Sequence, residues 1–213
     1  MADTDFTVIR HGQTAENLAG LLQGHTETVL DRLGLLQAQC AAERLRGEKF
    51  DHIFSSDLQR AMQTARIIAE AVGGEVIPLP ALREWHLGKL ENRLNTELWE
   101  KYPEVMNAFR YEEGELLIPG GESRFEFLKR VADCIDSLAA QYEGRRILLV
   151  THAGALRAIF RRIVGPVVND ALLPQVSNAA YSRFCRRGDR WQLCCWNDVS
   201  HLKNIEVRES VTF

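Results

Sequence analysis

Residues 7 to 14 combine an apolar run with an arginine, a histidine and a glycine, a set that could do chemistry on an anion. Arg10 and His11 stand where the apolar run stops, so a strand ending there would present an imidazole beside a permanent cation. Gly12 follows, and glycine lets the backbone approach a ligand where a side chain would collide. Phosphate is the ligand that this group predicts. On its own, however, such a short motif is common, and a lone histidine at a strand end is more often structural.

Three further segments supply the other groups that transfer of a phosphoryl group requires. The reaction needs a nucleophile, cations on the phosphoryl oxygens and a proton for the leaving oxygen. His11 as a neutral imidazole can attack phosphorus, and Arg10 and Arg60 can donate to the oxygens. His152 can add a donor, and Glu84 can serve first as general acid and then as the base that activates water. The first N–H groups of the helix after His152 are predicted to point at an anion.

The pattern of apolar residues predicts strands and helices that alternate along the chain. Strands are expected at residues 6–10, 50–55, 76–79, 146–150, 180–185 and 191–195. Helices are expected at 35–45, at 58–71, from 123 onward and at about 155–164. This order predicts an α/β fold, a three-layer α/β/α sandwich with a mostly parallel central sheet and a small helical insertion. Because the candidate residues all follow strands, we expect them at one edge of the sheet.

The length and one atypical segment suggest how the chain is organised. The 213 residues suit a single domain, 1–213, with a helical insertion or lid at about 85–120. That segment has two prolines, two tryptophans and weak helical periodicity. Its Trp85 is expected to pack in the core, while the role of His86 is left open.

The composition argues against several classes of partner. The net charge is −3, from 26 basic and 29 acidic residues spread along the chain, which provides no basic stripe for nucleic acid. No apolar run approaches the roughly 20 residues that span a bilayer and no signal peptide is evident, so we expect a cytoplasmic protein without a membrane partner. The five cysteines include no C-x-x-C pair, which predicts reduced thiols and no zinc site.

Taken in order, the chemical segments resemble the histidine phosphatase superfamily, also called phosphoglycerate mutase-like, over nearly the whole chain. They are Arg-His-Gly-Gln-Thr at 10–14, Ser-Ser-Asp-Leu-Gln-Arg-Ala at 55–61, Leu-Arg-Glu at 82–84, Pro-Gly-Gly-Glu-Ser at 119–123 and Thr-His-Ala-Gly at 151–154. The resemblance implies His11 as the phosphorylated nucleophile and Glu84 as the proton donor, with no metal and no cofactor. The phosphate pocket that it implies consists of Arg10, Asn17, Gln23, Arg60, His152 and Ala153.

The resemblance leaves the reaction partly open. A phosphohistidine can pass its phosphoryl group to water, as in a phosphatase, or back to the substrate, as in a mutase. We favour a phosphatase acting on a small phosphorylated metabolite, because the segment after Glu84 is short and its basic residues are offset by acidic ones. A mutase is the alternative, and a non-catalytic phosphate-binding module is less favoured. The substrate and the oligomeric state, a homodimer included, stay open.

Two departures from the family pattern bear on specificity. They fall at residues 29–34, where a helix entry is expected, and at residues 88–93. The second puts Asn92 and Arg93 near the predicted mouth of the substrate site.

Overall fold

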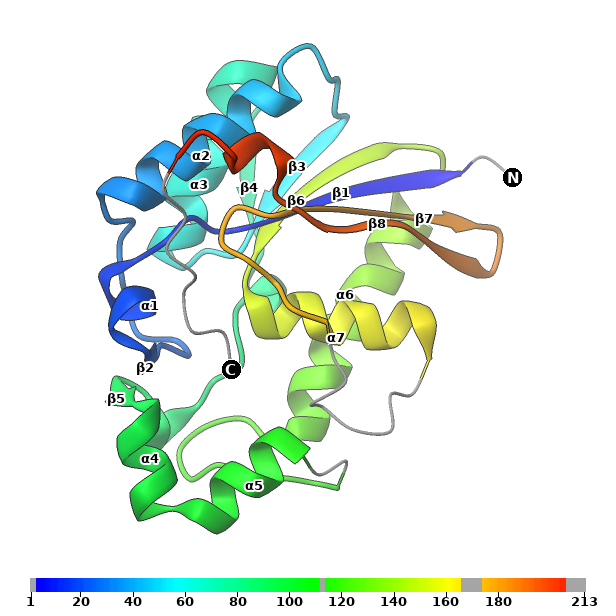
Figure 1. Ribbon diagram of the computed structural model, residues 1–213. Coiled ribbons are helices and arrows are strands. Elements are labelled where there is room, and N and C mark those ends of the chain that lie inside the picture. Colours follow the sequence, from blue (N-terminus) through cyan, green and yellow to red (C-terminus); the bar gives the residue numbers. More distant parts are fainter. Residues whose placement is uncertain (1–2, 112–113, 166–173, 206–213) are drawn as a thin grey trace.

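A six-stranded sheet forms the centre of the computed structural model, which describes residues 3–111, 114–165 and 174–205 (Figure 1). Its strands lie in the order β4-β3-β6-β1-β7-β8. They are β1 (Thr4–Arg10), β3 (His52–Ser55), β4 (Val76–Pro78), β6 (Arg146–Thr151), β7 (Tyr181–Arg187) and β8 (Arg190–Asp198). The first four of these strands are mutually parallel, and β7 and β8 extend the sheet antiparallel. The sheet is therefore mixed and mostly parallel, as predicted.

Helices cover both faces of the sheet (Figure 1). Residues of α2 (Arg32–Leu45) and α3 (Gln59–Val72) pack on one face, and those of α6 (Arg124–Gln141) and α7 (Ala153–Val164) on the other. The sequence of β6 is apolar throughout because the strand is buried on both faces. Ile147 and Leu149 pack in one core, and Leu148 and Val150 pack in the other. A strand buried on both faces needs no polar alternation. The α/β/α sandwich that the sequence predicts is confirmed.

The segment after Glu84 contains two short helices that lie together beyond the sheet (Figure 1). They are α4 (Asn95–Lys101) and α5 (Pro103–Tyr111), preceded by the single turn η2 (Gly88–Leu90). Three short elements that the sequence did not predict connect this region and the first loop. Strand β2 (Leu21–Leu22) pairs antiparallel with β5 (Arg93–Leu94), and the helix α1 (Ala15–Ala19) precedes β2.

Most predicted elements occur within a few residues of their expected bounds, but one glycine has another role. Gly12 does not make room for a ligand, because a Cβ there would collide with the carbonyl oxygen of Gly34 near the start of α2.

The departure at residues 29–34 is a helix entry, as expected: Asp31 caps α2 and accepts a hydrogen bond from the Gly34 amide at 2.7 Å. Short 3₁₀ turns, η1 (Pro80–Leu82) and η4 (Ser200–Leu202), complete the structure.

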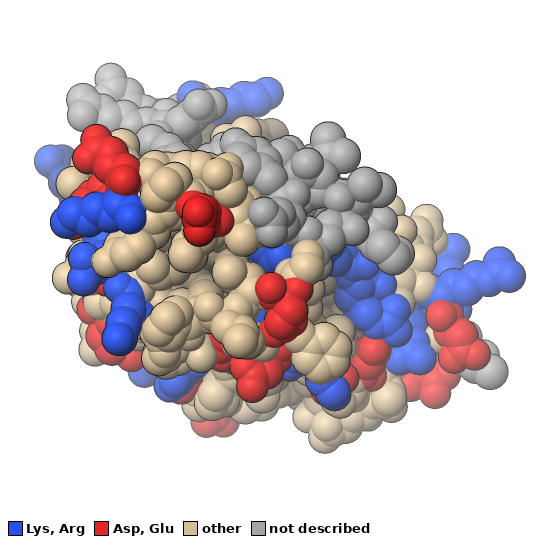
Figure 2. Space-filling view, turned by 90° about the horizontal axis from the view of Figure 1, so that it is seen from below, with Lys and Arg blue, Asp and Glu red and all other residues tan. Residues whose placement is uncertain are grey.

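Two surface properties bear on partners. On the face shown in Figure 2, basic and acidic side chains are interspersed among other residues. Within the described part of the chain, every helix is too short or too polar to cross a membrane.

Candidate active site

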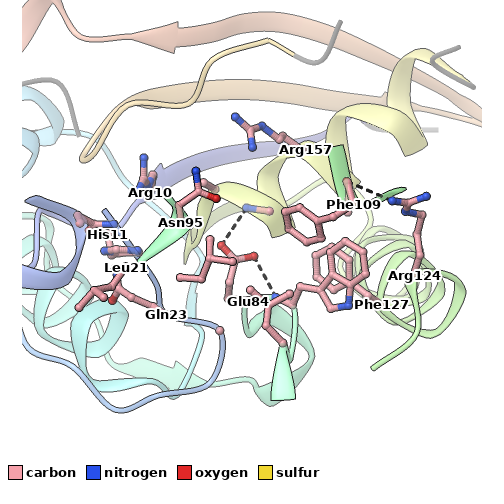
Figure 3. A pocket seen from close by; sticks show the side chains of 18 of the residues that line it. Arg10, His11, Leu21, Gln23, Glu84, Asn95, Phe109, Arg124, Phe127 and Arg157 are labelled. Carbon is pink, nitrogen blue, oxygen red and sulfur yellow. Dashed lines mark hydrogen bonds between the residues drawn. The ribbon is translucent and has the colours of Figure 1, made fainter. Parts of the chain in front are cut away.

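A cavity of about 420 Å³ opens at the carboxyl ends of the parallel strands. Seven of the eight residues predicted for the site line it: Arg10, His11, Asn17, Gln23, Arg60, Glu84 and Ala153. The eighth, His152, lies behind this wall and is fully buried. The strand ends thus bring distant segments to one edge of the sheet, as the sequence predicts. Figure 3 shows Glu84 between an end formed by Arg10 and His11 and an end formed by Phe109, Phe127 and Arg124.

His11 is buried, and one hydrogen bond determines its tautomer. Its Nδ1 lies 2.7 Å from the carbonyl oxygen of Gly12, and because a carbonyl only accepts, Nδ1 carries the proton. Burial, reinforced by the charges of Arg60 and Arg10, lowers the pKa of His11 well below its usual value. The ring is therefore neutral at neutral pH, and its Nε2 carries a free electron pair. That atom can act as a nucleophile.

Two buried arginines provide the positive charge of the cavity. Arg60 donates to the carbonyl oxygens of Gly24 and Thr26, to the hydroxyl of Thr28 and to His152, which uses four of its five N–H groups. Arg10 donates to the Val176 carbonyl, while its buried Nε has no hydrogen-bond partner among the described residues. Burial lowers the pKa of Arg10 to about 9 and that of Arg60 to about 10. Both remain cations at neutral pH.

His152 faces Arg60 and not the cavity. Its Nδ1 accepts from Nε of Arg60 at 3.2 Å, because a guanidinium can only donate. Burial, followed by the charge of Arg60, lowers the pKa of His152 well below its usual value, so the neutral ring carries its proton on Nε2. That Nε2–H donates to the hydroxyl of Ser56 at 2.7 Å. Both ring nitrogens are engaged by protein, and a direct bond from His152 to a phosphoryl group would require it to release Ser56.

The carboxylate of Glu84 is held by the backbone. It accepts from the amides of Gly154 at 2.9 Å, Ala155 at 3.2 Å and Trp85 at 3.0 Å. A Cβ at position 154 would collide with the carboxylate, so any other residue there would have to displace it. The first N–H groups of this helix therefore face an anion, as predicted, but at Gly154 and Ala155 that anion is the Glu84 carboxylate and not a phosphate. Neither amide is free, since both bind the carboxylate that shares the cavity with His11.

Residues from the first loop complete the end of the cavity at Arg10 and His11, which is the predicted phosphate end. Asn17 closes the capping box of α1 through Thr14 and also accepts from Asn178. Gln23 is buried and accepts from the Thr28 hydroxyl at 2.7 Å, which links it to a partner of Arg60. Gln23 and Arg60 are thus linked through Thr28, whereas Asn17 is joined to Thr14 and Asn178.

Two predicted residues near the mouth lie outside the cavity wall. Asn92 is exposed, and Arg93 donates to the Lys89 carbonyl. His86, whose role the sequence left open, stacks on His25 with ring centroids 4.6 Å apart, outside the cavity wall.

The far end of the cavity contains residues that sequence reasoning missed. Trp85 is buried in the core, as predicted, and also lines the cavity, where Phe109 and Phe127 stack on it at 5.1 and 5.2 Å between ring centroids. Arg157 and Arg161 line the cavity from α7. The spacing of Ala153, Arg157 and Arg161 puts them on one helical face, and this signal was available in the sequence.

The cavity has few groups that could hold a metal. Within residues 3–111, 114–165 and 174–205, no three histidine, cysteine or acidic side chains are grouped as metal ligands. What the cavity does hold is a neutral histidine, buried cations and one carboxylate, which is the set that a phosphoryl-transfer enzyme needs.

Comparison with known proteins defines the enzyme further. The chain belongs to the histidine phosphatase superfamily (branch 1), whose family model matches residues 6–199. It is a histidine phosphatase-type phosphomonoester hydrolase.

Three relatives illustrate the range of activities near this chain. A metal-independent phosphoserine phosphatase of Arabidopsis thaliana is 40% identical over 95% of this chain and 84% of the relative. A probable phosphoglycerate mutase of Proteus mirabilis is 37% identical over 95% of this chain and 96% of the relative. Among solved structures, a mycobacterial glucosyl-3-phosphoglycerate phosphatase is 33% identical with a TM-score of 0.81, covering 91% of this chain and 98% of the other.

Proposed function

We propose that this protein hydrolyses small phosphomonoesters whose alcohol carries a carboxylate, with phosphoserine as the first substrate to test. The names of the three relatives all refer to compounds of this kind, phosphoserine or a phosphoglycerate. The cavity supports the same chemistry, because Arg157 and Arg161 line it in addition to the phosphate-end cations Arg10 and Arg60. A guanidinium can form two parallel hydrogen bonds with a carboxylate, so an arginine at this position is suited to pair with a carboxylate on the substrate.

In the first step, Nε2 of His11 attacks phosphorus and the ester P–O bond breaks. Arg10 and Arg60 stabilise the charge on the phosphoryl oxygens as the bond breaks. Glu84 gives its proton to the leaving oxygen, so the alcohol departs neutral and a phosphohistidine remains. His152 contributes by orienting Arg60 through its Nδ1.

In the second step, water replaces the alcohol. The Glu84 carboxylate takes a proton from the water, whose oxygen attacks phosphorus as the N–P bond breaks. Inorganic phosphate leaves and neutral His11 is restored. No metal enters either step, and the amides that hold Glu84 keep it at the same cavity as His11.

The observation that carries this proposal is the state of His11. A buried imidazole that donates through Nδ1 and stays neutral has its Nε2 electron pair available, beside a buried arginine whose Nε has no hydrogen-bond partner among the described residues.

The test is a phosphate-release assay in EDTA with a matched pair of substrates. Phosphoserine and phosphoethanolamine differ by one carboxylate. We expect kcat/KM to be about tenfold or more higher for phosphoserine, the value of a charge-assisted hydrogen bond. His11→Asn should abolish turnover and the acid-labile phosphoenzyme. Equal rates for the two substrates would refute carboxylate recognition, and isomerisation of a phosphoglycerate without phosphate release would make the enzyme a mutase.

A second variant locates the carboxylate contact. Arg157→Met should remove the preference for phosphoserine while leaving the rate on phosphoethanolamine nearly unchanged. Arg162→Met is the matched control, because Arg162 lies on the same helix but pairs with Asp136 at the surface. Loss of the preference in both variants would mean that long-range charge, and not a contact at Arg157, selects the substrate.

A further inference from the structure

The backbone on either side of Glu84 is held by one side chain from a distant helix. Arg130 of α6 donates Nη1 to the carbonyl oxygens of Ala81 at 2.9 Å and Arg83 at 3.1 Å. Its Nη2 donates to the carbonyl of Glu84 itself at 3.1 Å. Three carbonyls within four residues therefore share one cation.

Glu122 completes the arrangement and connects it to the residues after Glu84. Its carboxylate accepts from Nε and Nη2 of Arg130 at 2.6 and 2.7 Å, and from the His86 amide at 3.1 Å. The Trp85 indole donates to the Glu122 carbonyl at 2.9 Å, and the Glu122 amide donates to the His86 carbonyl at 2.9 Å. The chain is thus fastened both before and after Glu84. Glu122 belongs to the Pro-Gly-Gly-Glu-Ser segment, to which the sequence assigned no function.

The geometry of Arg130 admits no simple replacement. An arginine has five N–H donors in a planar fork, and all five are used here: three on carbonyls and two on Glu122. Lysine has three donors on a point charge and cannot satisfy this set. Burial opposes the charge on Glu122, but the hydrogen bonds and charge of Arg130 and the His86 amide keep its pKa below the usual value. The pair is therefore ionised at neutral pH.

The close packing around Glu84 makes its position depend on these contacts. The carbonyl of Glu84 also accepts from His25 at 2.8 Å, and its carboxylate is held by the α7 amides. Gly121 lies so close to the backbone of His86 that a Cβ would collide with its carbonyl. A shift of the backbone at residue 84 would pull the carboxylate from the amides that aim it.

We propose that Arg130, paired with Glu122, is a positioning residue that aims the carboxyl of Glu84 at the leaving oxygen. This rests on the proposed role of Glu84 as the general acid. Arg130 does not line the cavity, so it acts only through the backbone that it binds. A positioning role can be distinguished from a purely structural role by comparing substrates. Misplacing the Glu84 carboxyl should slow only those substrates whose leaving group needs a proton.

The experiment compares kcat/KM for phosphoserine and for 4-nitrophenyl phosphate, since kcat/KM includes departure of the alcohol but not the later attack by water. An alkoxide needs a proton in order to leave, whereas 4-nitrophenolate does not. Arg130→Lys should lower kcat/KM for phosphoserine by about 100-fold, the effect expected from a misplaced catalytic group. The loss on 4-nitrophenyl phosphate should be much smaller. Glu84→Gln provides the reference pattern, with the same selectivity and a larger loss on phosphoserine.

The control is Arg183→Lys. Arg183 pairs with Asp5 at 3.0 Å near the amino end of β1, whereas the cavity lies at the carboxyl ends of the parallel strands. It should leave both rates nearly unchanged. Glu122→Gln is a milder second variant, because it keeps an acceptor for the His86 amide. It should show the same selectivity, and it keeps the test available if Arg130→Lys does not fold.

The outcomes are distinct. Equal losses on the two substrates in Arg130→Lys and in Glu122→Gln, with Glu84→Gln still selective, would overturn the positioning role while the proposed function stands. A wild-type enzyme without phosphatase activity on either substrate would overturn the proposed function and this proposal with it. A selective loss in the variants, absent in Arg183→Lys, supports the proposal.

Discussion

The two ends of the cavity are built from different kinds of interaction. At the phosphate end, Arg10, His11 and Arg60 are almost completely buried and are held by hydrogen bonds to carbonyl groups. At the other end, Phe109 and Phe127 stack on Trp85, and Arg124 lies over the Trp85 ring at 5.8 Å.

This difference predicts how each end responds to change. When one partner of a hydrogen bond to a buried charge is removed, the whole interaction is lost. The buried group left without a partner then costs further free energy. Contact between rings varies with area and is lost gradually. Substitutions at the phosphate end should therefore act on the chemical step, and those at the aromatic end on substrate affinity. The predictions below test this contrast.

The largest effect is expected from Arg60→Lys. A lysine keeps the charge but cannot hold Gly24, Thr26 and His152 together while also facing the phosphoryl group. We expect kcat/KM for phosphoserine to fall about 100-fold, as when a donor to the transition state is lost. Steady-state kinetics measures this loss, with Arg162→Lys as the control. A fall confined to KM, with kcat unchanged, would contradict the assignment of Arg60 to the chemical step.

An intermediate effect is expected on the pH dependence of stability. The pKa values of His11 and His152 are lowered in the native state by burial, then by Arg60, so these rings stay neutral when the unfolded chain binds protons below about pH 6.5. Unfolding then takes up protons, and stability falls as the pH drops from 7.5 to 5.5. The slope is at most about 1.4 kcal/mol per pH unit for each histidine. His25 and His201, whose pKa values burial also lowers, contribute in the same direction.

Urea unfolding at several pH values measures this slope. His152→Gln should reduce it, because one site of proton uptake is gone. The carboxyl groups whose pKa values are lowered, such as Asp57 and Glu122, change protonation at lower pH and should not contribute in this range. Equal slopes for the variant and the wild type would show that His152 titrates alike in both states.

The smallest effect is expected from Phe109→Ala. The substitution removes one ring from the stack on Trp85, an interaction worth about 0.5–1.5 kcal/mol. We expect a rise of less than about tenfold in KM for phosphoserine, with kcat nearly unchanged. Phe160→Ala is the control, since Phe160 packs on Trp196 outside the cavity wall. A kcat loss as large as that of Arg60→Lys would erase the distinction between the two ends.

Much of the fold could be predicted because its signals are local. The continuous apolar run of β6 and the helical spacing in α3 identify buried elements without knowledge of their neighbours. Strand β2 and strand β5 have two residues each, too few for any period, and α1 has only five. These elements exist because they pair with or cap other segments, which the local sequence does not show.

The candidate site was predictable in its residues but not in its contacts. Strand ends bring His11, Arg60 and Glu84 to one cavity, which the order of the elements implies. The amides of Gly154 and Ala155 could bind an anion from any source, and only the position of Glu84 shows that they bind its carboxylate. The inward orientation of His152 has the same origin, because its partners Arg60 and Ser56 come from another segment.

By itself, then, the sequence determined which chemical groups this protein has and at which edge of the sheet they gather, since apolar periodicity and strand order are properties of the chain. Only the tertiary structure decided which atoms face the cavity, which nitrogen of His11 holds the proton and which residue fastens the backbone of Glu84. The reason is physical. The direction of a buried polar side chain depends on the hydrogen-bond partner that it finds, and those partners come from segments far away in the chain.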